Sequence, residues 1–185
     1  MAILTFQFSS STAWQSKVIR KLCASPFSHT EVKLPDGNLL GASDSPTAPC
    51  ITGNPRGVAI RPPEYQRFDI RRQLRIETDK ADAVINKIMT QLGKPFDGDG
   101  VHHFLDDSIY TRNWRDPSAW FCSELCAWGC ENTYWEQELL WPKGRISPTG
   151  FFFLFMFDKN VINREEFWDQ IPGVILGPGE RFASI

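Results

Sequence analysis

WFCSELCAWG, residues 120–129, is the stretch on which the predicted organisation of the chain depends. Leu125 and Trp128 recur at helical spacing, which predicts a helix that begins at about Cys122. A cysteine in the first turn of a helix lies at the positive end of the macrodipole, beside backbone N–H groups that lack an intrahelical partner. That setting lowers the pKa of a thiol and favours a nucleophile. The alternative is that Cys122 is a small buried hydrophobic residue, which is the commonest role of a free cysteine.

The composition is that of an ordinary soluble globular protein. The chain has 185 residues, of which 42% are hydrophobic and 23% are charged. A chain of this length can bury a well-formed core, so we expect one domain over residues 1–185. The formal net charge of -2 predicts no strong general attraction to nucleic acid or to an anionic membrane. Nucleic acid is therefore not an expected partner.

The five cysteines suggest neither a disulfide framework nor a zinc knuckle, because their number is odd and no C-x-x-C pair occurs. Cys122, Cys126 and Cys130 fall at i, i+4 and i+8, which places them near one face of the predicted helix. Three thiols on one helix could ligate a metal, but tetrahedral zinc usually draws its ligands from separate segments. We therefore expect no metal and no cofactor, and a reducing compartment during synthesis.

Neither apolar stretch of the sequence is typical of a targeting or membrane-spanning segment. Residues 1–8 are apolar but carry no basic leader and no long apolar core, so no signal peptide is expected. The run FFFLFMF, residues 151–157, is far shorter than the roughly 20 residues that span a bilayer. This run is either a fully buried strand or a surface that binds a protein partner.

The rest of the chain alternates between strand and helix patterns, which indicates an α+β protein. Asp36-Gly37 between two apolar runs predicts a hairpin. Residues 65–76 alternate between apolar and mostly basic positions, which predicts a half-buried strand with a basic outer face, most simply a solvated sheet edge. We also expect strands at 2–8 and 57–61, a helix capped by Ser11 or Thr12 with Trp14, Val18, Ile19 and Leu22 on one side, a helix at 78–92 and a short helix at 101–109.

A catalytic cysteine needs a base to take its proton, and the base needs an orienting group. His102 and His103 are adjacent in a predicted helix, so at most one of them would face a site. His29 opens a predicted strand and precedes Glu31 by two residues, and residues i and i+2 of a strand point to the same side. His29 and Glu31 therefore share a side, opposite the presumed core position Val32.

The hairpin register bears on a second source for the orienting group. If Asp36-Gly37 forms a two-residue turn, His29 lies opposite Asp44 on the second strand, where the two can hydrogen bond. A slip of one residue would place Ser43 or Ser45 there instead. The sequence thus leaves the third member of the site open between Glu31, Ser43 and Asp44.

Several short motifs, taken in order, resemble a known family. They are SHTEV at 28–32, the PDG hairpin at 35–37, GV at 57–58, GKPFD at 93–97, WFCSEL at 120–125 and ISP at 146–148. Their order and spacing over residues 25–150 resemble the circularly permuted branch of the NlpC/P60 papain-like superfamily, near the YiiX and lecithin–retinol acyltransferase groups. The resemblance implies a single permuted papain-like domain, with an antiparallel sheet packed against helices, the histidine strand before the cysteine helix, and residues 158–185 as a C-terminal extension.

The resemblance also implies roles for individual residues. Cys122 would be the nucleophile, His29 the general base, and backbone N–H groups at the helix start would stabilise the oxyanion. Many relatives place a Glu or His on the second hairpin strand as the orienting residue. The matching position here is close to Gly41, which has no side chain, so another residue must substitute. We favour Glu31, because it shares a side with His29 whatever the hairpin register.

Three functions are compatible with these features. The first is a cysteine hydrolase of the amidase or peptidase type, acting through a thioacyl-enzyme on a substrate such as a peptidoglycan peptide. The second is an acyltransferase or lipid hydrolase, favoured if residues 151–157 line an apolar groove. The third is a non-catalytic structural component, for example of a phage particle, where such domains also occur. Relatives that act on cell walls or lipids often carry a signal or anchor. We expect neither in this sequence, and we therefore expect a cytoplasmic or particle-associated protein.

Overall fold

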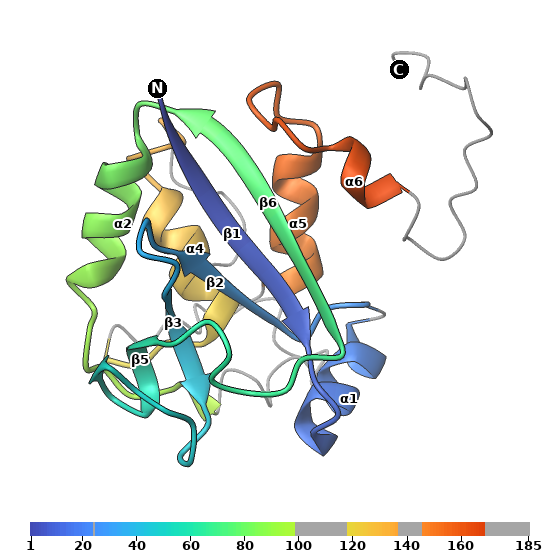
Figure 1. Cartoon of the computed structure of the whole chain (residues 1–185), viewed down its shortest axis with the longest axis vertical. Coiled ribbons are helices and arrows are strands. Elements are labelled where there is room, and N and C mark those ends of the chain that lie inside the picture. Colours follow the sequence, from blue (N-terminus) through green and yellow to red (C-terminus); the bar gives the residue numbers. More distant parts are fainter. Residues whose placement is uncertain (24, 99–117, 137–145, 169–185) are drawn as a thin grey trace, which may run out of the picture.

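The computed structural model describes residues 1–23, 25–98, 118–136 and 146–168. Its centre is a six-stranded antiparallel sheet in the order β4-β5-β3-β2-β1-β6 (Figure 1), which makes the protein α+β. The strands are β1 (Ala2–Ser10), β2 (His29–Lys33), β3 (Leu39–Asp44), β4 (Thr52–Gly53), β5 (Arg56–Arg61) and β6 (Ile70–Thr78). The helices are α1 (Trp14–Leu22), α2 (Ala81–Met89), α4 (Cys122–Cys130), α5 (Pro148–Met156) and α6 (Glu165–Trp168). The predicted helix at 101–109 lies outside the described residues.

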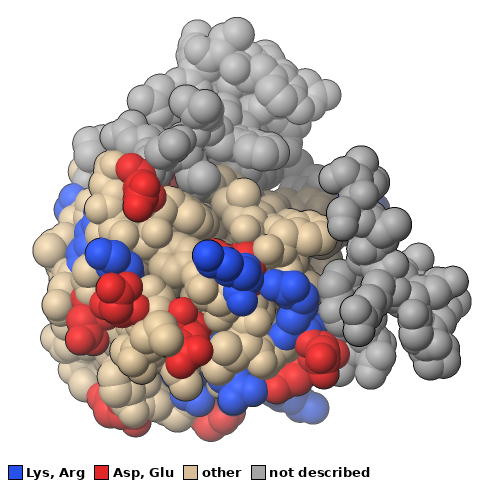
Figure 2. Space-filling view, turned by 90° about the horizontal axis from the view of Figure 1, so that it is seen from above, with Lys and Arg blue, Asp and Glu red and all other residues tan. Residues whose placement is uncertain are grey.

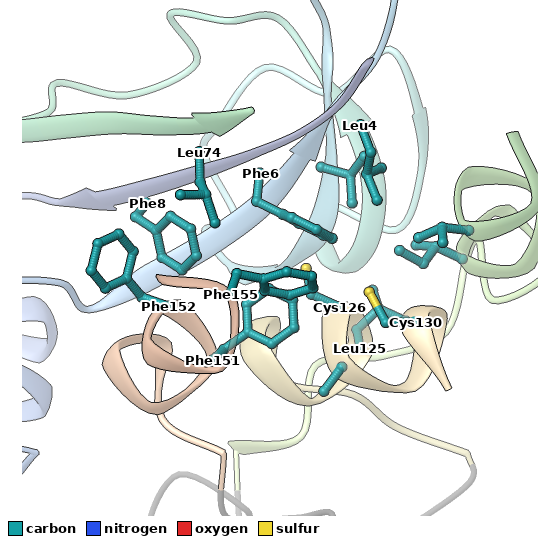
Figure 3. Packing of buried hydrophobic residues seen from close by; sticks show 14 of the residues in the cluster. Leu4, Phe6, Phe8, Leu74, Leu125, Cys126, Cys130, Phe151, Phe152 and Phe155 are labelled. Atoms are coloured by element: carbon teal, nitrogen blue, oxygen red, sulfur yellow. The ribbon is translucent and has the colours of Figure 1, made fainter. Parts of the chain in front are cut away.

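The hydrophobic core lies between the sheet and the helices α2, α4 and α5. Alternate residues of β1, namely Leu4, Phe6 and Phe8, are fully buried, as expected for a strand with one face on the core. Phe6 meets Phe151 of α5 edge to face, with ring centroids 4.9 Å apart. Figure 3 shows these rings packed between β1 and α5, with Cys126 and Cys130 of α4 beside them.

The phenylalanine run at 151–157 is part of a helix, so the expectation of a strand was wrong. Ser147 caps α5 by accepting a hydrogen bond from the backbone N–H of Gly150 at 2.9 Å, and Pro148 occupies the first helical turn. Both features favour a helix start. Most of the run is then buried against the sheet, while Phe153 and Phe157 remain 46% and 72% exposed.

Helix α4 begins at Cys122, where the spacing predicted it, and is the most enclosed helix of the fold. All its residues except Trp128 are buried. Figure 1 places it against β2 and β3 on one side and α2 on the other. A Cβ at Gly129 would come within 2.5 Å of Ile88 of α2, so the glycine permits the two helices to approach closely. Cys122, the first residue of α4, is therefore held in place by the packing of the core.

The β2–β3 hairpin has a three-residue loop rather than a two-residue turn, so its register is one of the one-residue slips that the sequence analysis left open. Leu34 N–H donates to Asn38 O at 2.8 Å, and Gly37 adopts a positive φ of 89°. A three-residue loop with glycine at the left-handed position is the next most common hairpin type. Lys33 consequently pairs with Leu39, and the paired register extends as far as Val32 and Leu40. Continued along both strands, this register sets Glu31 opposite Gly41 rather than Ala42.

Strand β6 begins at Ile70, five residues later than predicted. Tyr65 N–H donates to Pro62 O at 3.1 Å, so the chain turns after β5 before it enters β6. β6 is an edge strand of the sheet, as its basic outer face suggested. Arg71 pairs with Glu64 and Arg75 pairs with Glu166. Figure 2 shows positive and negative side chains interspersed on the face of the molecule that it draws.

Helix α1 differs from its prediction in its cap and in the exposure of its apolar side. Its N-cap residue is Ala13, without a side-chain cap, rather than Ser11 or Thr12. Trp14 and Val18, expected on one packed side, are 68% and 40% exposed. Among the residues that the structure describes, no helix is long and apolar enough to cross a membrane.

Candidate active site

Cys122 and His29 come together from segments that are far apart in the sequence. His29 is the first residue of β2, and Cys122 is the first residue of α4. The thiol and the imidazole lie close enough to change each other's pKa. The structure thus brings together the two residues that the sequence analysis assigned as nucleophile and base.

The two groups change each other's pKa in opposite directions. Burial alone would lower the pKa of His29, but the negative charges of Glu31 and Cys122 outweigh it and raise that pKa to about 10. Burial alone would raise the pKa of Cys122, but the positive charge of His29 and hydrogen bonds from the imidazole and the backbone lower it. The two shifts together favour a thiolate paired with an imidazolium, the form in which a cysteine acts as a nucleophile.

The other cysteines whose pKa is shifted are shifted the opposite way. Burial, with a smaller contribution from Cys122, raises the pKa of Cys23 to about 11. Burial raises the pKa of Cys126 and of Cys130 well above the ordinary value. Within the described ranges, no group of three or more His, Cys, Asp or Glu side chains is placed to hold a metal ion. Cys126 and Cys130 serve as core residues, and Cys122 alone of these four is activated.

Glu31 supplies the carboxylate beside His29. Its Oε1 lies 3.3 Å from His29 Nε2, and its side chain is fully buried whereas that of His29 is 13% exposed. A buried carboxylate on the second ring nitrogen fixes the imidazole and stabilises its charged form. Because Nε2 faces Glu31, Nδ1 is the nitrogen left for the thiol of Cys122.

Gly41 is the position that makes room for this carboxylate. A Cβ at Gly41 would come within 2.7 Å of Glu31 Cγ, closer than real Cβ atoms pack. The sequence analysis treated this glycine as the loss of an orienting residue. The structure instead places the carboxylate of the neighbouring strand over the space that the glycine leaves.

The other two candidates for the third residue occupy different places. Ser43 is buried and hydrogen bonds to Tyr65 rather than to His29. Asp44 is exposed and pairs with Arg56, with Oδ1 2.9 Å from Nε. Both line the same cavity as Cys122. Of the three candidates, Glu31 is the one in direct contact with the imidazole.

Tyr65 is a member of the site that sequence reasoning missed. Its hydroxyl lies 3.2 Å from His29 Nε2 and accepts a hydrogen bond from Gln66 Nε2 at 3.2 Å. Burial, and then the charge of Glu31, raise the pKa of Tyr65 well above its ordinary value, so the hydroxyl stays protonated. The pattern placed Tyr65 in a strand, although Pro62-Pro63 just before it was a signal for a turn.

The thiol and the imidazole line a cavity of about 620 Å³. One wall is formed by α1, through Trp14, Val18 and Ile19, and Phe96 and Phe121 add aromatic surface. Serine hydroxyls from several segments also line the cavity, and Asp44, which bears the one carboxylate among the described lining residues, is paired with Arg56. The cavity therefore combines apolar and neutral polar groups around Cys122 and His29.

The start of α4 also supplies hydrogen-bond donors beside the thiol. Phe121 is the N-cap residue and has no side-chain cap, and the backbone N–H of Ser123 bonds to the sulfur of Cys122. N–H groups at a helix N-terminus are free to bind an anion. A carbonyl attacked by Cys122 would therefore develop its negative charge next to the helix start.

Comparison of the chain with protein-family models, with curated proteins and with solved structures finds no significant match.

Replacing Gly41 by alanine should disturb Glu31 without touching Cys122 or His29. The new Cβ would overlap Glu31 Cγ and push the carboxylate away from the imidazole. We expect alkylation of Cys122 by iodoacetamide at pH 6 to slow about tenfold, the change that one pKa unit makes in the thiolate fraction. Gly98→Ala is the matched control, because Gly98 lines the same cavity and a Cβ there meets nothing within 4 Å. Equal rates for the two variants would contradict the role given to Glu31.

Proposed function

We propose that the protein is a cysteine-dependent hydrolase of the amidase or peptidase type, with Cys122 as nucleophile, His29 as general base and Glu31 as the orienting residue. One observation carries the proposal. A thiol whose pKa is lowered and an imidazole whose pKa is raised act on each other and line one cavity. Strongly perturbed pairs of this kind, set in a cleft, are typical of catalytic sites.

In the first half of the reaction, the Cys122 thiolate attacks the carbonyl carbon of an amide bound in the cavity. The carbonyl electrons move onto oxygen, where N–H groups at the start of α4 stabilise the charge. Such stabilisation is often worth about 3–4 kcal/mol. The tetrahedral intermediate collapses when the C–N bond breaks. The imidazolium of His29 donates its proton to the leaving nitrogen, so the amine departs neutral and a thioester on Cys122 remains.

In the second half, water replaces the amine. Neutral His29 takes a proton from the water as it attacks the thioester, and the C–S bond breaks after a second tetrahedral intermediate. The carboxylic acid leaves, and the thiolate–imidazolium pair forms again. Glu31, with Oε1 3.3 Å from His29 Nε2, supports the positive charge on the ring, as the aspartate does in a serine protease triad.

The proposal includes the fold family that the sequence resembles. In papain-like enzymes a cysteine at the start of a helix faces a histidine on the sheet, and in the permuted branch the histidine strand comes first in the chain. Two observations support this assignment: the order of β2 and α4, and the position of Cys122 as the first residue of its helix. On this reading a peptidoglycan peptide is a candidate substrate.

A second substrate class is favoured by one specific observation. Trp14 and Val18 of α1 are exposed apolar side chains that line the cavity beside the thiol. An apolar wall of this kind suits an acyl chain, so an ester or thioester of a fatty acid is the alternative substrate. With an acceptor other than water, the same thioacyl-enzyme would make the protein an acyltransferase.

The reactivity of Cys122 tests the proposal. Iodoacetamide labelling between pH 5 and pH 9, followed by mass spectrometry of each cysteine peptide, should show Cys122 reacting at pH 6 at least about tenfold faster than a model thiol of pKa about 8.5. Cys50, which is partly exposed, is the internal reference. If Cys122 reacts no faster than the model thiol, both enzymatic functions fall and a non-catalytic structural component is the better description.

Substrates then separate the two enzymatic functions. Wild-type protein is incubated with murein peptides and with p-nitrophenyl esters of short and long chains, and Cys122→Ser is the control. Intact mass measured after an acid quench should reveal an acyl group on wild-type protein only. Peptide cleavage without ester turnover supports the amidase assignment, whereas a preference for long-chain esters supports the acyl alternative.

A further inference from the structure

We propose that Tyr65 is a positioning residue that holds the imidazole of His29 in the orientation in which it exchanges a proton with Cys122. This inference rests on the proposed function and adds to it a residue outside the predicted triad. The hydroxyl of Tyr65 lies 3.2 Å from His29 Nε2, the same nitrogen that faces Glu31 at 3.3 Å. The imidazole is thus fixed by two groups and not by the carboxylate alone.

The hydrogen bonds around this hydroxyl have definite directions. When His29 is protonated, its Nε2–H donates toward Tyr65 and Glu31 together. The Tyr65 oxygen accepts a hydrogen bond from Gln66 Nε2 at 3.2 Å, and Ser43 and Glu31 lie close enough to the hydroxyl to shift its pKa. The hydroxyl therefore links imidazole and carboxylate into one connected arrangement. It keeps its own proton and takes no part in the transfer.

The ring of Tyr65 is itself firmly held. The guanidinium of Arg61 lies 5.5 Å from the ring centroid, and Phe68 meets the ring edge to face at 5.6 Å. Arg61 is fully buried and donates to the backbone oxygens of Gly41 at 3.0 Å and Gly57 at 2.9 Å. The ring of Tyr65 is therefore held by Arg61 of β5 and by Phe68, in addition to the contact of its hydroxyl with β2.

Strand β3, the second strand of the hairpin, contributes to the site indirectly, through Ser43. Ser43 of β3 is opposite His29 if the register of Val32 and Leu40 is continued. It reaches the imidazole through the hydroxyl of Tyr65 and not by direct contact. The orienting function that relatives place on this strand is thus shared between Glu31 and the Ser43–Tyr65 pair.

Tyr65→Phe tests the inference, because it removes the hydroxyl and keeps the ring contacts. We expect alkylation of Cys122 at pH 6 to slow about tenfold, as for loss of a hydrogen bond to a charged group. Tyr134→Phe is the matched control. It also removes a hydroxyl bonded to a carboxylate, that of Asp158 at 2.6 Å, outside the residues of the site. Proton NMR of the His29 ring, assigned with His29→Ala, should show the imidazolium losing its proton at lower pH in Tyr65→Phe.

The outcomes separate this inference from the proposed function. If wild-type Cys122 is reactive at pH 6 and Tyr65→Phe matches it in both rate and His29 titration, Tyr65 is only structural and the inference is overturned. If wild-type Cys122 is unreactive, the proposed function falls, and the NMR titration still decides whether Tyr65 holds the ring. Should Tyr65→Phe fail to fold, Ser43→Ala, which removes one hydrogen bond to the hydroxyl, must shift the His29 titration in the same direction or the inference fails.

Discussion

His29→Ala should slow the alkylation of Cys122 at pH 6 by about 100-fold, because the thiol loses the cation that keeps it ionised. In the folded protein burial opposes ionisation of Cys122, and the charge of His29 reverses that effect. Without the imidazole, burial is opposed only by the backbone hydrogen bonds to the sulfur, so we expect the thiol to stay protonated at pH 6. Hydrolysis of a substrate should fall further, by about 10²–10⁴-fold, because the general base is lost as well.

The pH dependence of the wild-type protein follows from the same pair. The pKa of Cys122 is lowered, so alkylation should already be fast below the ordinary thiol range and should decline only when acid protonates the thiolate. The pKa of His29 is raised to about 10, so the imidazolium should persist until the solution is strongly alkaline. His29→Ala should move the alkylation profile to higher pH, which rate measurements between pH 5 and pH 10 would show.

The other two histidines provide the control for this result. His102 and His103 lie outside the described residues and were the alternative bases in the sequence analysis. His102→Ala and His103→Ala should each leave the alkylation profile of Cys122 close to that of the wild type. A loss of reactivity in either of these variants, with none in His29→Ala, would remove His29 from the site.

Phe151→Ala should destabilise the fold by about 3–5 kcal/mol, the usual cost of truncating a buried phenylalanine. The Phe151 ring is fully buried and packs on Phe6 with centroids 4.9 Å apart and on Phe155 with centroids 5.2 Å apart. The side chain therefore joins α5 to β1. A loss of this size is a large part of the roughly 5–15 kcal/mol that holds a domain folded. Urea unfolding followed by tryptophan fluorescence measures it.

Phe153→Ala is the matched control for this experiment. Phe153 lies on the same helix, two residues away, and is 46% exposed. Its removal should cost no more than about 1 kcal/mol, as is usual for partly exposed positions. Similar losses of unfolding free energy in the two variants would show that α5 does not pack on the sheet through Phe151.

The parts of the site that depend on local geometry could be predicted from the sequence. The start of α4 at Cys122 follows from helical spacing, which is set within a few residues. The shared side of His29 and Glu31 follows from the alternation of a strand. Both features hold whatever the rest of the chain does, so no knowledge of tertiary contacts was needed.

The parts that failed depend on choices that the local sequence leaves open. The segment Leu34-Pro35-Asp36-Gly37-Asn38 suits a two-residue or a three-residue loop, and one residue of difference decides whether Ser43 or Asp44 faces His29. An apolar run such as 151–157 fits a buried strand or a buried helix equally well, and the decision came from the Ser147-Pro148 start signal. Tyr65 reaches the site through a turn whose course is set by distant contacts, so no local pattern revealed it.

The near-complete burial of α4 separates the position of the Cys122 sulfur from the choice of side chains on the α1 wall of the cavity. The reactive sulfur belongs to a helix enclosed by the sheet, α2 and α5, whereas the facing wall on α1 presents Trp14 and Val18 to solvent. Side chains that contribute little to the core can be exchanged at small cost in folding free energy. If Cys122 is the nucleophile that we propose, single substitutions on α1 could change the preferred substrate while the packing of α4 keeps the sulfur in place.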